Sequence, residues 1–302
     1  MTKHRMQLLL IAILLAALLV ACGGGEAEPA AVDEAAEPGA AVVEEPAETE
    51  ADEAASDELT VADIQQEGTL VVGTAITKPF EYHDPDTNEL IGFDVDVANY
   101  IGDKLGVEVE FSEMPFASLI PSLQTRKVDM TIAAMYINPE REEVVDFATP
   151  YMETGLVMVV DPELEGEITT TEDLSGHSVG VKIGATGDAL AQELIAQGID
   201  LERREYKETL ESFADLEAGR IDAVLNDYLN TLSYLNDTGS ELKIVSDENG
   251  EPLFLSNVGL GIAVHDGDAD LLAAINDALA EMQADGTYDE LFEKWLGVAR
   301  GE

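Results

Sequence analysis

The fold is decided first at Thr69–Thr74, where the chain reads TLVVGT. A short apolar run of this kind predicts a strand that is buried on both faces. Apolar side chains then recur at helical spacing between Asp94, which predicts a helix N-cap, and Gly106, which predicts the helix end. A second strand is predicted at Val107–Phe111. The chain therefore opens on a strand, a helix and another strand.

A further helix and strand complete this first block. Apolar residues from Phe116 to Leu123 mark the helix, and Pro121 is compatible with it only near the first turn, where backbone N–H groups lack helical partners. The strand is predicted at Val128–Ala133. Three strands that alternate with two helices predict parallel pairing with right-handed crossovers.

The same pattern restarts in the second half of the chain. Strands are predicted at Ser178–Lys182, Leu201–Tyr206 and Ile221–Leu225, with helices near 186–197, 208–218 and 227–236. A last strand is predicted at Val258–Val264, and two amphipathic helices follow it. Two such blocks predict an α/β protein of two lobes rather than one continuous sheet.

The N-terminus has the pattern of an export signal. Basic residues precede an apolar run from Met6 to Val20, and Cys22, the only cysteine, follows Ala21. This is typical of a secretory signal peptide, and with a cysteine after the small residues it resembles a bacterial lipoprotein signal. The alternatives are a buried core cysteine and an uncleaved membrane helix, for which roughly 20 apolar residues are needed. We expect residues 1–21 to be removed and Cys22 to carry lipid.

Residues 22–58 predict a disordered, acidic linker. Thirteen of residues 23–58 are acidic, and the segment has no aromatic residue, lysine or arginine. Such a composition buries too little apolar surface to offset the entropy cost of ordering, and its like charges repel and extend the chain. Residues 59–302 remain for the folded part, which is long enough for two linked lobes.

The charge balance excludes some partners. The chain has 63 acidic and 15 lysine or arginine residues, which give a formal net charge of −48. This excess argues against nucleic acid or anionic lipid as a binding partner. It suits a saline habitat, where salt screens the repulsion.

The sequence shows no motif for catalysis, metal binding or cofactor binding. His4, His83, His177 and His265 are not spaced as metal ligands, and the chain has no GxSxG, GxxxxGK[ST] or GxGxxG motif. One glycine-framed turn between a strand and a helix stands at Gly184–Gly187. We therefore expect no enzyme activity, no cofactor and no metal.

Short motifs in a specific order carry a resemblance that covers residues 68–297. They are LVVGT at 70–74, PF at 79–80, GFDVD at 92–96, LIPSL at 119–123, PER at 139–141, VDF at 145–147, PY at 150–151, VGVK at 179–182, GRIDAV at 219–224, DGT at 285–287 and Trp295. With these pieces the chain resembles the family 3 extracellular solute-binding proteins, the amino-acid receptors of ABC importers.

The resemblance implies a periplasmic-binding-protein clamshell of type II, in which two hinge strands join two α/β lobes. The chain would cross near 152–157 and return near 253–259, so that lobe 1 holds 59–154 plus 256–302 and lobe 2 holds 155–255. Ligand binding in the cleft would close the lobes, and the importer's membrane subunits would recognise the closed form. The family also implies a monomer.

The resemblance further implies a site for a zwitterion. Arg141 stands where the family supplies a bidentate guanidinium to the ligand carboxylate. Asp227 stands where the ligand ammonium finds a carboxylate. Backbone N–H groups of Ala185, Thr186 and Gly187 would add an anion seat at a helix start.

Phe116 matches the family's aromatic residue that packs on the ligand. The residues alone leave other roles open for these positions. Arg141 is compatible with a surface ion pair to Glu140 or Glu143, Asp227 with a helix cap, and Phe116 with a plain core position.

Departures from the family pattern narrow the range of ligands that we expect. The segment Ala75–Lys78 is one residue short and lacks an aspartate that commonly receives a basic side chain, which disfavours lysine, arginine and histidine. Ala134, Tyr136 and Ala185 stand where small hydroxyl residues are frequent, and Tyr136 would reshape the pocket. Lys182 is placed to meet a polar or acidic side chain. We expect a polar uncharged or acidic amino acid, or a related zwitterion such as a compatible solute.

Two other functions are compatible with the sequence. One is a sensory module that passes ligand occupancy to a separate signalling protein. The other is a dehydratase on the same fold, which would need a proton donor over a substrate ring, and the motifs indicate no such acid beyond Asp227.

Overall fold

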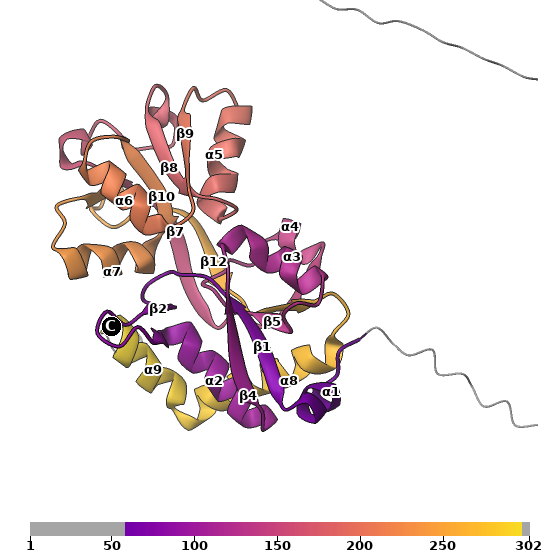
Figure 1. The fold of residues 1–302 in the computed structure, drawn as a ribbon. Helices are drawn as coiled ribbons and strands as arrows, with labels where there is room; N and C mark the ends of the chain where they lie inside the picture. The colour runs from indigo at the N-terminus through magenta and orange to yellow at the C-terminus, as the bar shows by residue number, and fades with distance from the viewer. Residues whose placement is uncertain (1–57, 298–302) are drawn as a thin grey trace, which may run out of the picture. The chain divides into compact units, whose positions relative to one another are not determined.

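The computed structural model describes residues 58–297, which form a two-lobed α/β fold around two separate sheets (Figure 1). The predicted signal peptide, Cys22 and all but the last residue of the predicted linker lie outside the described residues. Within 58–297, no helix has both the length and the apolar character needed to cross a membrane.

The first lobe is built on a five-stranded sheet with the order β4-β1-β5-β13-β6. β1 pairs in parallel with β4 and β5, and β13 pairs antiparallel with β5 and β6. Its elements are α1 (Val61–Glu67), β1 (Thr69–Thr74), β2 (Tyr82–His83), β3 (Leu90–Ile91), α2 (Phe93–Leu105), β4 (Glu108–Glu113), η1 (Phe116–Ser118), α3 (Leu119–Gln124), β5 (Met130–Thr131), α4 (Pro139–Glu142), β6 (Val145–Phe147), β13 (Ala263–His265), α8 (Ala269–Asp285) and α9 (Thr287–Leu296).

The second lobe is built on a sheet with the order β11-β7-β10-β8-β9, and β12 also pairs with β7. β8 pairs in parallel with β9 and β10, and β7 runs antiparallel to β10, β11 and β12. Its elements are β7 (Met152–Val160), η2 (Pro162–Leu164), η3 (Glu172–Leu174), β8 (Ser178–Lys182), α5 (Thr186–Ala196), β9 (Glu202–Tyr206), α6 (Thr209–Glu217), β10 (Ala223–Asp227), α7 (Tyr228–Thr238), β11 (Lys243–Ile244) and β12 (Phe254–Leu260).

Each lobe repeats one parallel arrangement, as the two predicted blocks require. β1 is the first strand of its block and lies between the second and third strands, β4 and β5. β8 lies in the same way between β9 and β10. The strand order reverses direction at these central strands, and such reversals are where open α/β sheets bind ligands.

β7 and β12 form an antiparallel ribbon that joins the lobes (Figure 1). Its pairing runs from Met152 with Leu260 to Val157 with Phe254, and the register shifts between Phe254 and Ser256. The two chain crossings expected from the family lie in these strands. The lobe boundaries at 154/155 and 255/256 fall inside the ribbon and stay a prediction.

The N-cap predicted at Asp94 is wrong. The N-cap of α2 is Gly92, and a Cβ atom there would lie 2.0 Å from the carbonyl oxygen of Phe80, so the helix start requires glycine. The buried Asp94 carboxylate instead accepts hydrogen bonds from the Ala134 N–H, at 2.7 Å, and the Tyr151 hydroxyl, at 3.0 Å. It therefore ties α2 to the loop that follows β5.

The single strand predicted at Val258–Val264 is also wrong. Up to Leu260 the chain pairs with β7, whereas β13 pairs with β5 and β6 in the first sheet. The chain changes sheets at Gly261, between these two sets of partners. The strand predicted at Val128–Ala133 is shorter than expected and is paired at Met130–Thr131.

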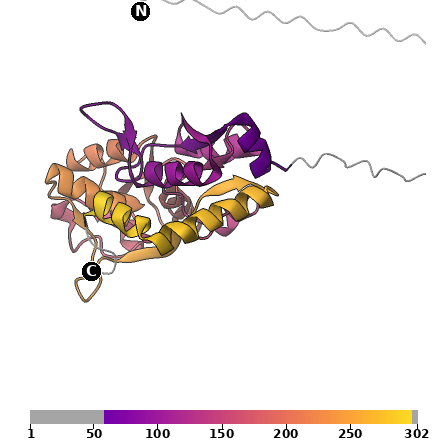
Figure 2. The same cartoon turned by 90° about the horizontal axis from the view of Figure 1, so that it is seen from below.

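Apolar side chains fill both faces of the sheets. In the first lobe α8 lies against α2 (Figure 2), and buried residues such as Phe93, Ile101 and Ile275 join them to the sheet. In the second lobe, Val157 and Val159 face one cluster while Met158 and Val160 face another. The central strands are thus covered by helices on both faces, as parallel sheets require.

Candidate functional site

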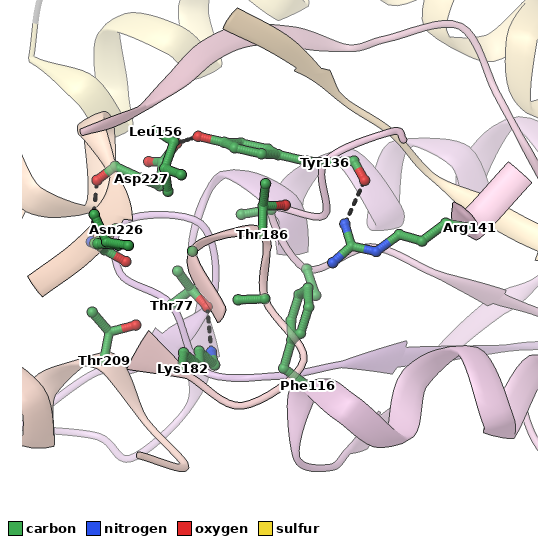
Figure 3. Close-up of a pocket in the computed structure, with 15 residues that line it drawn as sticks. Thr77, Phe116, Tyr136, Arg141, Leu156, Lys182, Thr186, Thr209, Asn226 and Asp227 are labelled. Carbon is green, nitrogen blue, oxygen red and sulfur yellow. Dashed lines mark hydrogen bonds between the residues drawn. The ribbon is translucent and has the colours of Figure 1, made fainter. Parts of the chain in front are cut away.

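One pocket collects side chains from the carboxyl ends of strands in both lobes (Figure 3). Thr77 follows β1, Phe116 follows β4 and Tyr136 follows β5, while Thr186 follows β8 and Asp227 ends β10. The free space among these side chains measures about 50 Å³, room for a few water molecules. The strand ends at which the order reverses in each lobe therefore face the same pocket.

All eight residues predicted to bind the ligand line this pocket. They are Arg141, Asp227, Phe116, Thr186, Ala134, Tyr136, Lys182 and Ala185. Their contact with a ligand stays a prediction, but the fold brings them together from both lobes.

The sequence did not single out several other lining residues, among them Thr77, Leu156, Thr209 and Asn226. Thr77 lies in the shortened segment after β1. The length of that segment departs from the family pattern, but nothing in the sequence marks the Thr77 hydroxyl group. Asn226 directly precedes Asp227, so its place beside the pocket follows from the same strand end. Leu156 and Thr209 carry no signal in the sequence that separates them from ordinary strand and helix positions.

Arg141 is a buried cation, not a surface ion pair with Glu140 or Glu143. Its side chain is 8% exposed, and its guanidinium donates hydrogen bonds to the backbone carbonyls of Tyr136 and Gly184. Burial lowers the pKa of Arg141 to about 10, so it remains protonated at neutral pH. Among residues 58–297 no carboxylate forms an ion pair with this guanidinium, so its charge is available to the carboxylate of a ligand.

Asp227 both caps a helix and faces the pocket. One carboxylate oxygen accepts the N–H of Asn230 at 2.8 Å, which makes Asp227 the N-cap of α7. The other accepts the hydroxyls of Tyr136, at 2.7 Å, and Thr154, at 2.9 Å. Burial raises the pKa of Asp227, and the hydrogen bonds it accepts oppose that rise. An ammonium group at this oxygen has to share it with, or displace, the Tyr136 hydroxyl.

Phe116 lies between two cations. The Arg141 guanidinium carbon and the Lys182 ammonium nitrogen are each 5.4 Å from its ring centroid. The same ring packs in the core against Leu119 and Met135, so the core role that the sequence left open is also correct.

Lys182 reaches from the second lobe to the first. It is 7% exposed, and its ammonium donates to the carbonyl of Ile76 at 3.1 Å and to the hydroxyl of Thr77 at 3.0 Å. Burial lowers the pKa of Lys182, while Glu208 and Glu81 oppose that effect.

The start of α5 provides backbone donors beside the pocket. Gly187 lets the helix approach β10, because a Cβ atom there would lie 2.5 Å from the carbonyl oxygen of Leu225. The N–H groups at a helix start have no intrahelical partner, and α5 has no side-chain cap. The Ala185 N–H donates to the carbonyl oxygen of Lys182 at 3.0 Å, and its role as an anion donor stays a prediction. Thr186 and Gly187 remain as candidate donors.

Pocket side chains also join the two lobes to each other. Tyr136 reaches Asp227, and Lys182 reaches Thr77 in the segment after β1 (Figure 3). Arg141 reaches the carbonyl oxygen of Gly184. Opening the cleft must break these hydrogen bonds. The groups that would hold a ligand are therefore also the groups that hold the lobes together.

Two buried acids lie behind the pocket. Glu81 and Asp94 are both 0% exposed, and neither Glu81 oxygen has a hydrogen-bond donor. Burial raises the pKa of Asp94 to about 6, and burial together with the nearby Asp94 charge raises the pKa of Glu81 well above its usual value. A proton on this pair gives the two carboxyls a hydrogen bond to each other.

We expect this acid pair to make the fold more stable in mild acid. The folded pKa of Asp94 lies above its unfolded value of 3.8, so the folded chain binds more protons between those values and stability falls as pH rises from about 4 through about 6. For Asp94 the loss is on the order of 3 kcal/mol. Asp94→Asn keeps an acceptor for Ala134 and should flatten the dependence, as measured by urea unfolding from pH 4.5 to 8.

The matched control is Asp96→Asn on the same helix. Its carboxylate lies nearer the surface, bonded to Lys294 and Trp295. We expect this variant to keep the wild-type slope with pH even if it lowers stability overall. A wild-type slope in Asp94→Asn would contradict the assignment to Asp94.

Two α/β lobes, a hinge ribbon and a charged pocket between the lobes define a two-lobed solute-binding protein. The family model of the bacterial extracellular solute-binding proteins, family 3, matches residues 70–298. The chain belongs to this family, as its sequence motifs indicated.

The relatives in the family are named for binding different amino acids. The L-cystine-binding protein TcyJ of Escherichia coli (strain K12) is 35% identical over 243 residues, which are 80% of this chain and 88% of that protein. The ABC transporter arginine-binding protein 1 of the same strain is 35% identical over 209 residues, 69% of this chain and 83% of that protein. An ancestral arginine-binding protein, solved bound to glutamine, is 42% identical with a TM-score of 0.68, and the match covers 76% of this chain and 99% of that one.

Proposed function

We propose that the chain captures an L-α-amino acid between its lobes and delivers it to an ABC importer. The observation that carries the proposal is the presence of the Arg141 guanidinium and the Asp227 carboxylate in one buried pocket. An α-amino acid has one carboxylate and one ammonium, and these are the two charges that such a pocket complements. The relatives named for cystine and arginine binding support the same class of ligand.

The charged ends of the ligand would engage both lobes. Arg141 lies in the first lobe and receives the ligand carboxylate, aided by the Thr186 N–H at the start of α5. Asp227 lies in the second lobe and receives the ammonium at the oxygen that now accepts from Tyr136. A ligand that binds both lobes favours their closed arrangement, because its affinity for that arrangement is higher. The importer would then distinguish loaded from empty protein by this closure.

We further propose a ligand with a polar uncharged or acidic side chain. Lys182 lines the pocket beside Phe116, and Asp227 is the single acid among the described residues that line it. A cationic side chain there would face Lys182 without a second carboxylate in the lining. The cystine-binding relative and the glutamine-bound ancestral protein support this preference, whereas the arginine-binding relative supports the cationic alternative.

We infer binding without catalysis. A dehydratase needs an acid free to move a proton over the substrate. Both oxygens of Asp227 already accept hydrogen bonds, and Glu81 and Asp94 lie behind the pocket lining. The names of the relatives describe binding proteins, which supports this inference.

We propose that lipid on Cys22 holds the protein at the outer side of the cell membrane. The motif Leu19–Cys22 and the acidic segment that follows support an anchor and a tether. The importer's permease would then lie within reach of the tethered lobes. We expect the working unit to be a monomer.

Thermal unfolding of the full chain in detergent tests the proposal. A ligand at 100 times its Kd stabilises the native state by about 2.7 kcal/mol, which raises Tm by roughly 5–10 °C in a protein of this size. We expect such a rise with one or a few of the common amino acids, and least with lysine or arginine. Unchanged Tm with every amino acid and compatible solute would overturn the proposal, and a rise with arginine alone would overturn the preference for non-cationic side chains.

A further inference from the structure

A second cavity lies between the lobes, next to the first. It measures about 480 Å³ and is lined by the segment Ile76–Pro85 of the first lobe and by the beginning of α6 and much of α7 of the second. Thr77 and Thr209 line both cavities. We call this second cavity the outer chamber. The two cavities therefore adjoin at Thr77 and Thr209.

The boundary between the two cavities holds one cation and one anion. The Lys182 ammonium, which lines the inner pocket, lies 3.6 Å from a carboxylate oxygen of Glu208, which lines the outer chamber. That Glu208 oxygen is shielded from solvent and accepts no hydrogen bond. At 3.6 Å the ion pair is longer than a charge-assisted hydrogen bond. Two of the three Lys182 N–H groups already donate, to Ile76 and Thr77, so the third N–H and the Glu208 oxygen are the groups that a ligand of opposite charge can engage.

The walls of the outer chamber are apolar and aromatic. Phe213 is buried and stacks on Tyr234 with ring centroids 4.4 Å apart. Leu210, which is 64% exposed, adds an aliphatic side chain. On the rim, Lys78 and Asp237 form an ion pair of 2.8 Å between the lobes. Such a chamber suits a sulfur or methylene link, since sulfur packs favourably on aromatic rings.

We propose that the outer chamber and its boundary form a distal subsite for the second head group of a two-headed α-amino acid. The first head group lies on Arg141 and Asp227, the connecting chain passes Thr77 and Thr209, and the second carboxylate and ammonium lie on Lys182 and Glu208. The proposed ligands are bis-α-amino acids, which carry two α-amino-acid head groups. L-cystine is one of them, and the relative TcyJ is named for binding it. The proposal rests on the proposed function and names its substrate class.

The spacing within L-cystine agrees with this assignment. The two α-carbons joined by a disulfide lie about 6 Å apart, and the two cations of the inner pocket, Arg141 and Lys182, flank one ring at 5.4 Å each from the Phe116 centroid. Glu208 lies 3.6 Å from Lys182, whereas Lys78 and Asp237 pair with each other and are about half exposed.

Calorimetric titration of the full chain in detergent with L-cystine and with S-methyl-L-cysteine tests the subsite. The second compound keeps one head group and the sulfur and lacks the other head group. We expect L-cystine to bind at least about tenfold more tightly, the effect of one or two charge-assisted contacts. Glu208→Gln should weaken L-cystine by about tenfold and leave S-methyl-L-cysteine within about twofold of wild type.

The matched control is Glu211→Gln, one turn further along α6. Glu211 shares the capping box with Glu208, does not line the chamber, and glutamine suits its position. We expect wild-type affinity for both compounds. S-methyl-L-cysteine also reports that Glu208→Gln is folded.

Four outcomes would overturn the subsite. Equal affinity of the wild-type chain for the two compounds, or a Glu208→Gln change that weakens both alike, leaves the proposed function intact and removes the distal subsite. Binding of S-methyl-L-cysteine without L-cystine has the same meaning. No binding of any α-amino acid removes the proposed function and the subsite together.

Discussion

Arg141→Ala is expected to abolish amino-acid binding while the free protein stays folded. The guanidinium is buried, and a ligand carboxylate placed in the same pocket without it would lose its charged partner. Removing one member of a buried charge pair costs about 3–5 kcal/mol, so affinity should fall by about 2 to 3.5 orders of magnitude, beyond detection for a ligand that binds weakly to the wild-type chain. Isothermal titration with the amino acid that raises Tm in the wild-type chain measures the loss.

The free protein should tolerate this change. In the absence of ligand, Arg141 donates to two backbone carbonyls, Tyr136 and Gly184, and losing a typical hydrogen bond costs about 1 kcal/mol. Arg141→Lys should bind with intermediate affinity, because it keeps the charge and loses the bidentate fork. The matched control is Arg220→Ala, which removes an exposed arginine paired with Asp215 and should bind as wild type. Tight binding by Arg141→Ala would place the carboxylate seat elsewhere.

Asp227→Asn is expected to separate the two roles of Asp227. Asparagine is as good an N-cap as aspartate, so the free protein should unfold with nearly the wild-type free energy. Its side-chain amide donates to Tyr136 and Thr154, whose hydroxyls can accept as well as donate. The negative charge for the ligand ammonium is gone, and affinity should fall at least about 100-fold.

Asp227→Ala is the companion variant. It should lose ligand affinity to the same extent and, in addition, about 1 kcal/mol of stability, because the N–H of Asn230 loses its cap. Urea unfolding of the two ligand-free variants measures how much the helix cap contributes to stability. Calorimetric titration measures how much the carboxylate charge contributes to ligand affinity. Wild-type affinity in Asp227→Asn would show that the carboxylate serves α7 alone.

The parallel core of each lobe was predictable because its signals are local. Runs such as Thr69–Thr74 and Ser178–Lys182 are apolar, short and followed by helical periodicity, and the structure has strands at both. The order of three strands and two helices then leaves few arrangements. The pocket residues were predictable only through family motifs, since nothing in the spacing of Arg141 and Asp227 brings them together.

Other features depend on contacts between segments that are distant in the chain, and no local sequence pattern predicts them. Asp94 has the sequence pattern of a cap, yet its carboxylate is buried and accepts hydrogen bonds from Ala134 and Tyr151, which are 40 and 57 positions away in the chain. The bond between Tyr136 and Asp227 exists only once the lobes meet. The outer chamber arises in the same way from two segments more than 120 positions apart in the chain, 76–85 and 208–238.

The ribbon that joins the lobes also brings the two ends of the second lobe close together, so that this lobe can be exchanged as one segment. Gly155 is paired with Asn257, and paired residues of antiparallel strands have α-carbons about 5 Å apart. A segment whose two ends adjoin can be cut out and replaced without stretching its host. Recombination at these two points would swap Lys182, Glu208 and Asp227 and keep Arg141. New side-chain preferences can thus arise in one recombination event while Arg141, the proposed partner of the ligand carboxylate, is retained.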